Sequence, residues 1–346
     1  MKILKSKRLW GLLLAVGLLI SCFYNFDFKS VVKEILAINY WYLVPLVFLE
    51  AVIAFIRATR LKFIFDPVKK IKLKDIYSIY CIGMMTNLLM PYLTGQVARI
   101  YLFSKKEDLK KTFLATTTVL ELLFDGLALL LILVVISPFP GAHNNFHSWH
   151  FYVPAILILG TSGVFFALSR SHGLIASLTQ RFTAKLPALA QRKIEDIRHS
   201  FLSALEILKS SKHFFAVSAL SILSWLVQAA MVYFLILAFN FPVTLWGAVV
   251  ITVVVTVMMT VVLSPANIGT LQAATWAALH PFGIEKSPAL AFSILLHIAI
   301  YIPPILLGTF FSFKEGLTFK QLQVEGERGV ESLEVDDSAE GAPEAK

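Results

Sequence analysis

The sequence predicts an all-α polytopic membrane protein with six full transmembrane helices and two re-entrant helical hairpins. The hairpins form part of an inverted repeat, and both termini are cytoplasmic. Three observations predict this fold class. Apolar residues make up 57% of the chain and charged residues 15%, whereas soluble domains average about 25% charged residues. The apolar residues form runs of about 20, which suits a membrane-spanning helix. The basic residues gather in short loops between these runs, as the positive-inside rule describes.

Composition also argues against several other classes. The net charge of +9 does not indicate nucleic acid, because its basic residues lie in loops between apolar runs. The runs are longer than the ~10 residues of a barrel strand and do not alternate. Cys22 and Cys81 are expected on opposite membrane faces, so we expect neither a disulfide nor a metal framework. We expect no nucleic-acid partner, metal or cofactor.

The first span is expected over residues 9–26, starting inside after four basic residues. A cleaved signal peptide is the alternative, because Leu19–Cys22 resembles a lipoprotein cleavage box. Both interpretations place residue 27 outside. Segment 27–40 is then an outside loop or an interfacial helix.

A broken apolar stretch follows the second span, which is expected over residues 41–65. This stretch, residues 77–103, lies between two basic loops. Its 27 residues are too few for two spans of about 20 residues each. A single span would place one basic loop outside. A re-entrant hairpin, broken at Pro91, keeps both loops inside.

The remaining spans are expected over residues 112–137, 151–169, 213–240 and 288–313. Segment 170–212 is basic and amphipathic, and we interpret it as a cytoplasmic segment lying on anionic inner-leaflet lipids. The fifth span ends outside and the sixth begins there. The apolar segment 245–281 must therefore enter from outside and return. A conventional eight-span topology would instead move one basic group outside.

The two hairpins predict an internal symmetry. Residues 41–137 and 213–313 each read span, hairpin, span, with opposite orientation. Each hairpin breaks at Pro-x-x-x-Gly, at Pro91–Gly95 and at Pro265–Gly269. Inverted repeats with broken helices are typical of secondary transporters.

We accordingly expect one integral membrane domain over residues 1–316. Residues 317–346 are expected to form an acidic, disordered tail. The chain has no nucleotide-binding loop or hydrolase motif, and its soluble segments are too small for a catalytic domain. We therefore expect that it is not an enzyme.

Charged residues inside the predicted spans mark a candidate substrate site. Arg99 follows the first break by one turn, and Glu121 and Asp125 share one face of the third span. We interpret Arg99, with Arg57, as binding a lipid phosphate. Glu121 or Asp125 would balance that charge or accept a proton. The alternatives are a structural ion pair at Arg99 and snorkelling of Arg57 and Arg60 to the inner interface.

Residues at the breaks complete the candidate site. Broken helices leave backbone groups unpaired, and helix N-termini attract anions. The residues concerned are Asn87, Pro91, Gly95, Pro265, Asn267 and Gly269.

The order of these residues resembles a known family. The matching pieces are Arg57-x2-Arg60, Asn87-x3-Pro91-x3-Gly95-x3-Arg99, Glu121-x3-Asp125 and Pro265-x2-Ile268-Gly269. They resemble the lysylphosphatidylglycerol synthase transmembrane-region family of flippase-like proteins, over about residues 5–315. The family often has an acidic residue where this chain has Gln96.

The resemblance implies a multi-pass protein of the bacterial or archaeal cytoplasmic (inner) membrane that moves or binds a lipid. Long family members add a soluble aminoacyl-transferase domain, which this chain lacks, so we do not expect synthase activity. We expect a lipid flippase or translocase for a polar or anionic lipid of the phospholipid or polyprenyl-phosphate type. The expected partners are that lipid and anionic inner-leaflet lipids at 170–212. The sequence leaves open whether the protein forms a homodimer. The alternatives are a small-solute secondary transporter and a non-transporting scaffold for a lipid- or glycan-modifying enzyme.

Overall fold

A computed structural model describes residues 28–89, 94–136, 210–261 and 265–317, with the single residues 156, 160 and 321. All regular structure in these ranges is helical. The long and medium helices are α2 (Phe28–Ala37), α3 (Leu43–Phe65), α4 (Leu73–Leu89), α5 (Thr94–Glu107), α6 (Lys111–Ile136), α10 (Ser211–Ala238), α11 (Leu245–Val261), α12 (Thr270–Leu279) and α13 (Lys286–Lys314). Short 3-10 turns are η2 (Tyr40–Tyr42), η4 (Pro265–Asn267) and η5 (His280–Phe282).

Several predicted features lie outside the described residues. They are the spans 9–26 and 151–169, the cleavage-box residues Leu19–Cys22, Pro91 at the first break, most of segment 170–212, and nearly all of the tail 317–346.

Four helices are long and apolar enough to cross a membrane: α3 together with η2, α6, α10 and α13. Their bounds agree within a few residues with the spans predicted from hydropathy. α13 remains one helix although it contains Pro303 and Pro304, as membrane helices tolerate where neighbouring groups satisfy the freed backbone. The chain is therefore an integral membrane protein with several apolar helices.

Between these long helices, shorter helices form two hairpins. α4 packs against α5, and α11 packs against α12. Lys106 Nζ, near the end of α5, lies 3.2 Å from Asp75 Oδ1 at the start of α4. At the second hairpin, a Cβ atom added to Gly247 would lie 3.0 Å from the Phe282 ring. Each hairpin therefore returns the chain to the end of the bundle from which it started.

The hairpin helices are also short. α4 and α11 each have 17 residues. At about 1.5 Å per residue they are about 26 Å long. The hydrocarbon core of a bilayer is about 30 Å thick, so the described part of neither helix is long enough to cross it along the normal.

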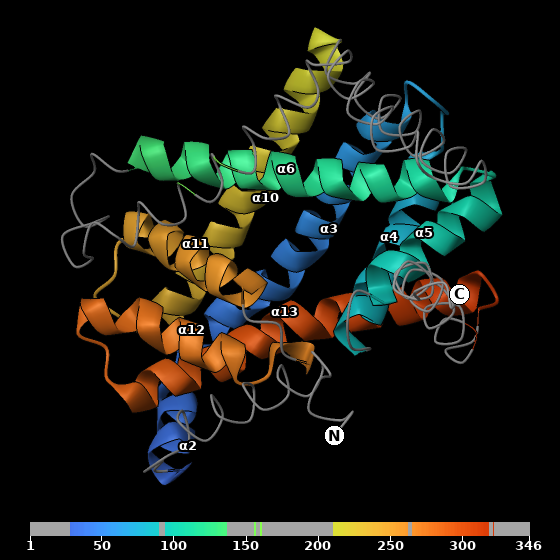
Figure 1. The fold of residues 1–346 in the computed structure, drawn as a ribbon. Coiled ribbons are helices and arrows are strands. Elements are labelled where there is room, and N and C mark those ends of the chain that lie inside the picture. Colours follow the sequence, from blue (N-terminus) through green and yellow to red (C-terminus); the bar gives the residue numbers. More distant parts are fainter. Residues whose placement is uncertain are drawn as a thin grey trace, which may run out of the picture.

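The first long helices of the two hairpin-containing segments, α3 and α10, run in opposite directions. The N–H of Asn39, just before α3, donates a 3.0 Å hydrogen bond to the carbonyl of Ala238 at the end of α10. At the other end of the pair, the rings of Phe63 and His213 lie 6.2 Å apart. α3 and α10 are thus antiparallel neighbours. In Figure 1 the α4–α5 hairpin lies on one side of this pair and the α11–α12 hairpin on the other.

The helix contacts follow the same pattern in both halves. In each half the first long helix packs on the first hairpin helix, the two hairpin helices pack together, and the second packs on the last long helix. Between the halves, α3 packs on α13 and α10 packs on α6 to a similar extent. α4 packs extensively on α13, whereas the corresponding contact between α11 and α6 is small. The two halves therefore share the order of contacts within each half and differ in the contacts between them.

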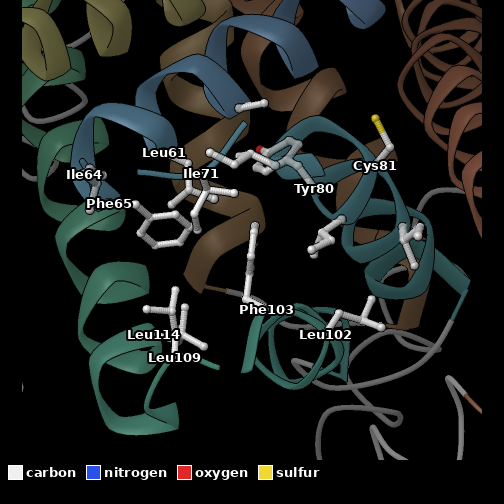
Figure 2. Packing of buried hydrophobic residues seen from close by; sticks show 14 of the residues in the cluster. Leu61, Ile64, Phe65, Ile71, Tyr80, Cys81, Leu102, Phe103, Leu109 and Leu114 are labelled. Carbon is white, nitrogen blue, oxygen red and sulfur yellow. The ribbon is translucent and has the colours of Figure 1, made fainter. Parts of the chain in front are cut away.

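Two large apolar clusters form the core, one around each hairpin. In the first cluster, Phe65 of α3 packs edge-on against Phe103 of α5, with ring centroids 5.1 Å apart (Figure 2). α3 contributes to both clusters: Leu46 to that of the second hairpin, and the stretch from Ala54 to Phe65 to that of the first. Glu50 lies between these two stretches, and it is 3% exposed.

Candidate functional site

The charged residues singled out in the sequence gather in one buried cluster between α3, α5, α6 and α10. We call Arg60, Arg99, Glu121 and Asp125 the arginine–carboxylate cluster. Arg60 is 1% exposed, Arg99 8% and Glu121 6%. Charges at such depth are normally paired and face the interior of a helix bundle.

Arg60 joins three helices. Both of its Nη atoms donate to Asp125 of α6, and the Nη2–Oδ2 distance is 3.1 Å. This forked geometry is the strongest form of an arginine–carboxylate pair. Nη1 also donates to Ser221 Oγ of α10 at 2.9 Å. The indole N–H of Trp225, also on α10, completes the shell of Asp125 at 3.2 Å.

Arg99 connects the first hairpin to α6. Its Nη2 atom donates to Glu121 Oε1 at 2.8 Å and to Thr118 Oγ1 at 3.2 Å. Its guanidinium carbon lies 5.6 Å from the centre of the Tyr80 ring. Glu121 also lies 3.4 Å from Arg60 Nη2, so this carboxylate bridges two guanidinium groups.

A small residue makes room for Arg99. A Cβ atom added to Gly83 of α4 would lie 3.1 Å from Arg99 Cβ. Gly83 therefore lets α5 approach α4 closely where the arginine leaves the hairpin. Gly83 was not among the predicted site residues, and its spacing carries no signal that marks it.

The expectation that Arg60 snorkels to the inner interface is wrong. The side chain turns inward because Glu121 and Asp125 on the facing helix offer it two carboxylates. At the membrane surface Arg60 would lose both of these partners. The spacing of Glu121 and Asp125 predicted cationic partners, since two carboxylates one turn apart on a membrane helix require them. The spacing did not indicate which of the three arginines are those partners.

Arg57 lies beside the cluster in a different state. Its guanidinium carbon stacks 5.4 Å from the centre of the Trp225 ring, a cation–π contact. Its Nε is buried and makes no hydrogen bond. In the part of the chain that the structure describes, no ion pair joins Arg57 to a carboxylate. Glu121 and Asp125 thus pair with Arg60 and Arg99. The positive charge that these two carboxylates leave unpaired is that of Arg57.

The first break depends on a close approach. A Cβ atom on Gly95 would lie 2.2 Å from Asn87 Cβ and 2.4 Å from the Asn87 backbone nitrogen. Only glycine allows the start of α5 to lie so close to the end of α4. Asn87 itself is exposed.

The second break depends on unusual backbone conformation. Ala266 and Asn267, which follow Pro265 in η4, have φ of 52° and 53°, and Gly269 has φ of 84°. Asn267 Nδ2 donates to Tyr301 Oη of α13 at 3.1 Å, and that hydroxyl donates to the Ala266 carbonyl. The N–H of Gly269 is capped by Gln272 Oε1 at 2.8 Å. The break is therefore anchored to α13.

The structure brings together only part of the predicted site. Arg99, Glu121 and Asp125 meet, with Arg57 adjacent. The described break residues do not join them. Asn267 bonds to Tyr301 of α13, and Gly95 packs on Asn87 within its own hairpin.

Comparison with known proteins supports the same family as the motifs. The chain matches the family described as the lysylphosphatidylglycerol synthase TM region over residues 8–308. It is similar to the UPF0104 membrane protein MJ1595 of Methanocaldococcus jannaschii, with 21% identity over 318 residues that cover 89% of this chain and 95% of the relative. No solved structure matches. The chain belongs to the lysylphosphatidylglycerol synthase transmembrane-region family.

Proposed function

We propose that the protein is a translocase that moves a lipid with an anionic headgroup across the cytoplasmic membrane of a bacterium or archaeon, without acting as an enzyme. One observation carries the proposal. Arg57 is a guanidinium on a membrane-spanning helix, stacked on Trp225 and without a carboxylate partner in the described residues. An unpaired charge in a span is costly. A phosphate that binds there would supply the missing negative charge.

The family supports a lipid as the source of that phosphate, since its name refers to a lipid synthase. Guanidinium groups bind phosphate through two parallel N–H···O bonds. The neighbouring arginines are held by Glu121 and Asp125, which leaves Arg57 as the cation that remains for a ligand.

We further propose that both hairpins are re-entrant, that they enter from opposite sides, and that the halves 41–137 and 213–313 are inverted repeats within a six-span topology. The antiparallel packing of α3 on α10 supports opposite orientation. The short hairpin helices and the matched helix contacts support the repeat. In such proteins the substrate site lies at the repeat interface near the membrane midplane. Arg57 and Trp225 contact each other across the α3–α10 interface of the two halves.

Reconstitution into vesicles tests the proposal. The vesicles contain phosphatidylglycerol labelled on an acyl chain, and an impermeant reductant quenches label that reaches the outer leaflet. We expect the wild type to move this lipid and Arg57→Gln to move it about tenfold to a hundredfold more slowly. A charge-assisted hydrogen bond contributes about 1.5–3 kcal/mol, and each 1.4 kcal/mol is about tenfold.

The matched control is Lys62→Gln, which removes a cation from the inner end of the same helix. Lys62 is paired with Asp66 at 2.9 Å, so this variant should move lipid like the wild type. A wild type that moves no more lipid than empty vesicles would overturn the proposed function. Equal rates for Arg57→Gln and the wild type would overturn the assignment of Arg57.

A further inference from the structure

A second buried group on α3 has no partner. Glu50 is 3% exposed, and its Oε2 atom is buried without a hydrogen bond. In the described part of the chain, no ion pair includes Glu50. Glu50 therefore differs from the two predicted acidic residues, Glu121 and Asp125, which are held by arginines.

The surroundings of Glu50 offer one charge. α3 packs against α10, α4 and α13. Away from their ends, these helices carry the titratable residues Tyr233, Tyr77, Tyr80, Cys81, His297 and Tyr301. Among the described residues, none of these donates a hydrogen bond to Glu50. Arg57 is the charged group whose electrostatic interaction reaches it.

Glu50 and Arg57 are also placed to meet. They are seven residues apart on α3, and therefore on one face two turns apart. The rise between them is about 10 Å. Extended arginine and glutamate side chains can bridge that distance. The present arrangement, with Arg57 stacked on Trp225, leaves them apart.

The charge state of Glu50 follows from its setting. An isolated carboxylate in an apolar environment costs far more than the neutral acid. Without a partner, Glu50 therefore carries a proton. If Arg57 turned towards it, the ion pair would allow the proton to leave. A phosphate on Arg57 would oppose that, because the phosphate and an ionised Glu50 would compete for the same cation.

We propose, on the basis of the proposed function, that Glu50 is the group that couples lipid movement to protons. It holds a proton while an anionic headgroup occupies Arg57 and releases the proton when Arg57 turns to pair with it. Binding of the headgroup and binding of the proton then favour each other, and this linkage is reciprocal. The lipid and the proton cross together, in the same direction.

A direct test measures protons during binding. The whole protein in uncharged detergent, in weak buffer with a pH indicator, is mixed with short-chain phosphatidylglycerol. The measurement is repeated over a range of pH, because uptake requires free protein in which Arg57 is paired with an ionised Glu50. We expect uptake to rise with pH towards about one proton per lipid bound, and no uptake with short-chain phosphatidylcholine. Binding of phosphatidylglycerol without proton uptake at any pH would overturn the proposal and leave the proposed function intact. Since this measurement uses the wild type, it does not depend on how a variant folds.

A second test uses the vesicle assay with an imposed pH gradient. Its readout is the ratio of lipid movement with and without the gradient. We expect a ratio well above one for the wild type and close to one for Glu50→Gln. The matched control is Glu34→Gln on α2, outside the long helices, which should keep the wild-type ratio. A Glu50→Gln protein that keeps that ratio, or one that is folded but moves no lipid at all, would overturn the coupling role. Absence of movement in the wild type would instead overturn the proposed function.

Discussion

The two halves of the bundle share the order of their helix contacts and differ in their charges. Helices α3 to α6 carry six charged residues away from helix ends: Glu50, Arg57, Arg60, Arg99, Glu121 and Asp125. In α10 to α13, Lys, Arg, Asp and Glu occur only near helix ends.

Equivalent contacts make the difference clear. In the first half, α5 is joined to α6 by Arg99 and Glu121 at 2.8 Å. In the second half, α12 is joined to α13 by Gln272 and His297 at 3.4 Å. A neutral polar pair thus holds one hairpin in place, so ionic charge is not required for that purpose. The comparison argues that the charges of the first half serve more than structure.

The largest expected effect comes from Arg60→Met. It leaves Asp125 and Glu121 buried with one cation fewer, and breaking a buried pair in this way costs about 3–5 kcal/mol. The corresponding change in the second half, Gln272→Leu, removes neutral hydrogen bonds and should cost about 1–3 kcal/mol. Thermal unfolding in detergent measures both. Equal losses for the two variants would contradict the electrostatic difference between the halves.

The double variant Arg99→Gln/Glu121→Gln gives the first half the kind of contact that the second half has. We expect Arg99→Gln alone to destabilise by about 3 kcal/mol, and the double variant to recover most of that loss, because a neutral pair leaves no unpaired charge. Lipid movement by the double variant should fall if the cluster holds Arg57 in position. Unfolding curves and the vesicle assay measure the two outcomes. A double variant less stable than the single one would show that the ionic charge itself holds this hairpin.

The glycines at the two breaks should respond to alanine for different reasons. Gly95→Ala places a Cβ atom 2.2 Å from Asn87 Cβ, so the hairpin must open, at about 1–3 kcal/mol. Gly269→Ala is strained by φ of 84°, which costs about 1–2 kcal/mol. The added variant Asn87→Gly should not restore Gly95→Ala, because the new Cβ atom would still lie 2.4 Å from the Asn87 backbone nitrogen. Thermal unfolding of Gly95→Ala with and without Asn87→Gly checks this, and full recovery of stability would contradict a clash with the backbone.

The smallest effect is expected where the first hairpin begins and ends. Lys106 pairs with Glu315, which follows α13, at 2.7 Å and with Asp75 at 3.2 Å. These side chains are partly exposed, so Glu315→Gln should cost no more than about 1 kcal/mol. High salt should reduce the difference from the wild type. Where the second hairpin begins and ends, Phe282 lies against Gly247, so Phe282→Leu should show no such salt dependence.

Local sequence patterns correctly predicted the membrane class, the four described spans and the second break at Pro265–Gly269. Hydropathy over about 20 residues decides the spans, and these signals are local. The sequence also marked Arg99, Glu121 and Asp125, because a charged side chain in a membrane span is costly and is expected to have a partner or a function.

The pairing of the buried charges became evident only from the arrangement of the helices in the fold. Arg57 and Arg60 are three residues apart, and the sequence treats them alike. In the fold, Arg60 meets Asp125 and Ser221, while Arg57 stacks on Trp225 and Glu50 remains without a partner. The physical reason is that partners depend on how each helix is rotated and on which helix faces it. Those relations come from packing between residues more than 60 positions apart, such as Arg60 and Asp125, and no local pattern contains them.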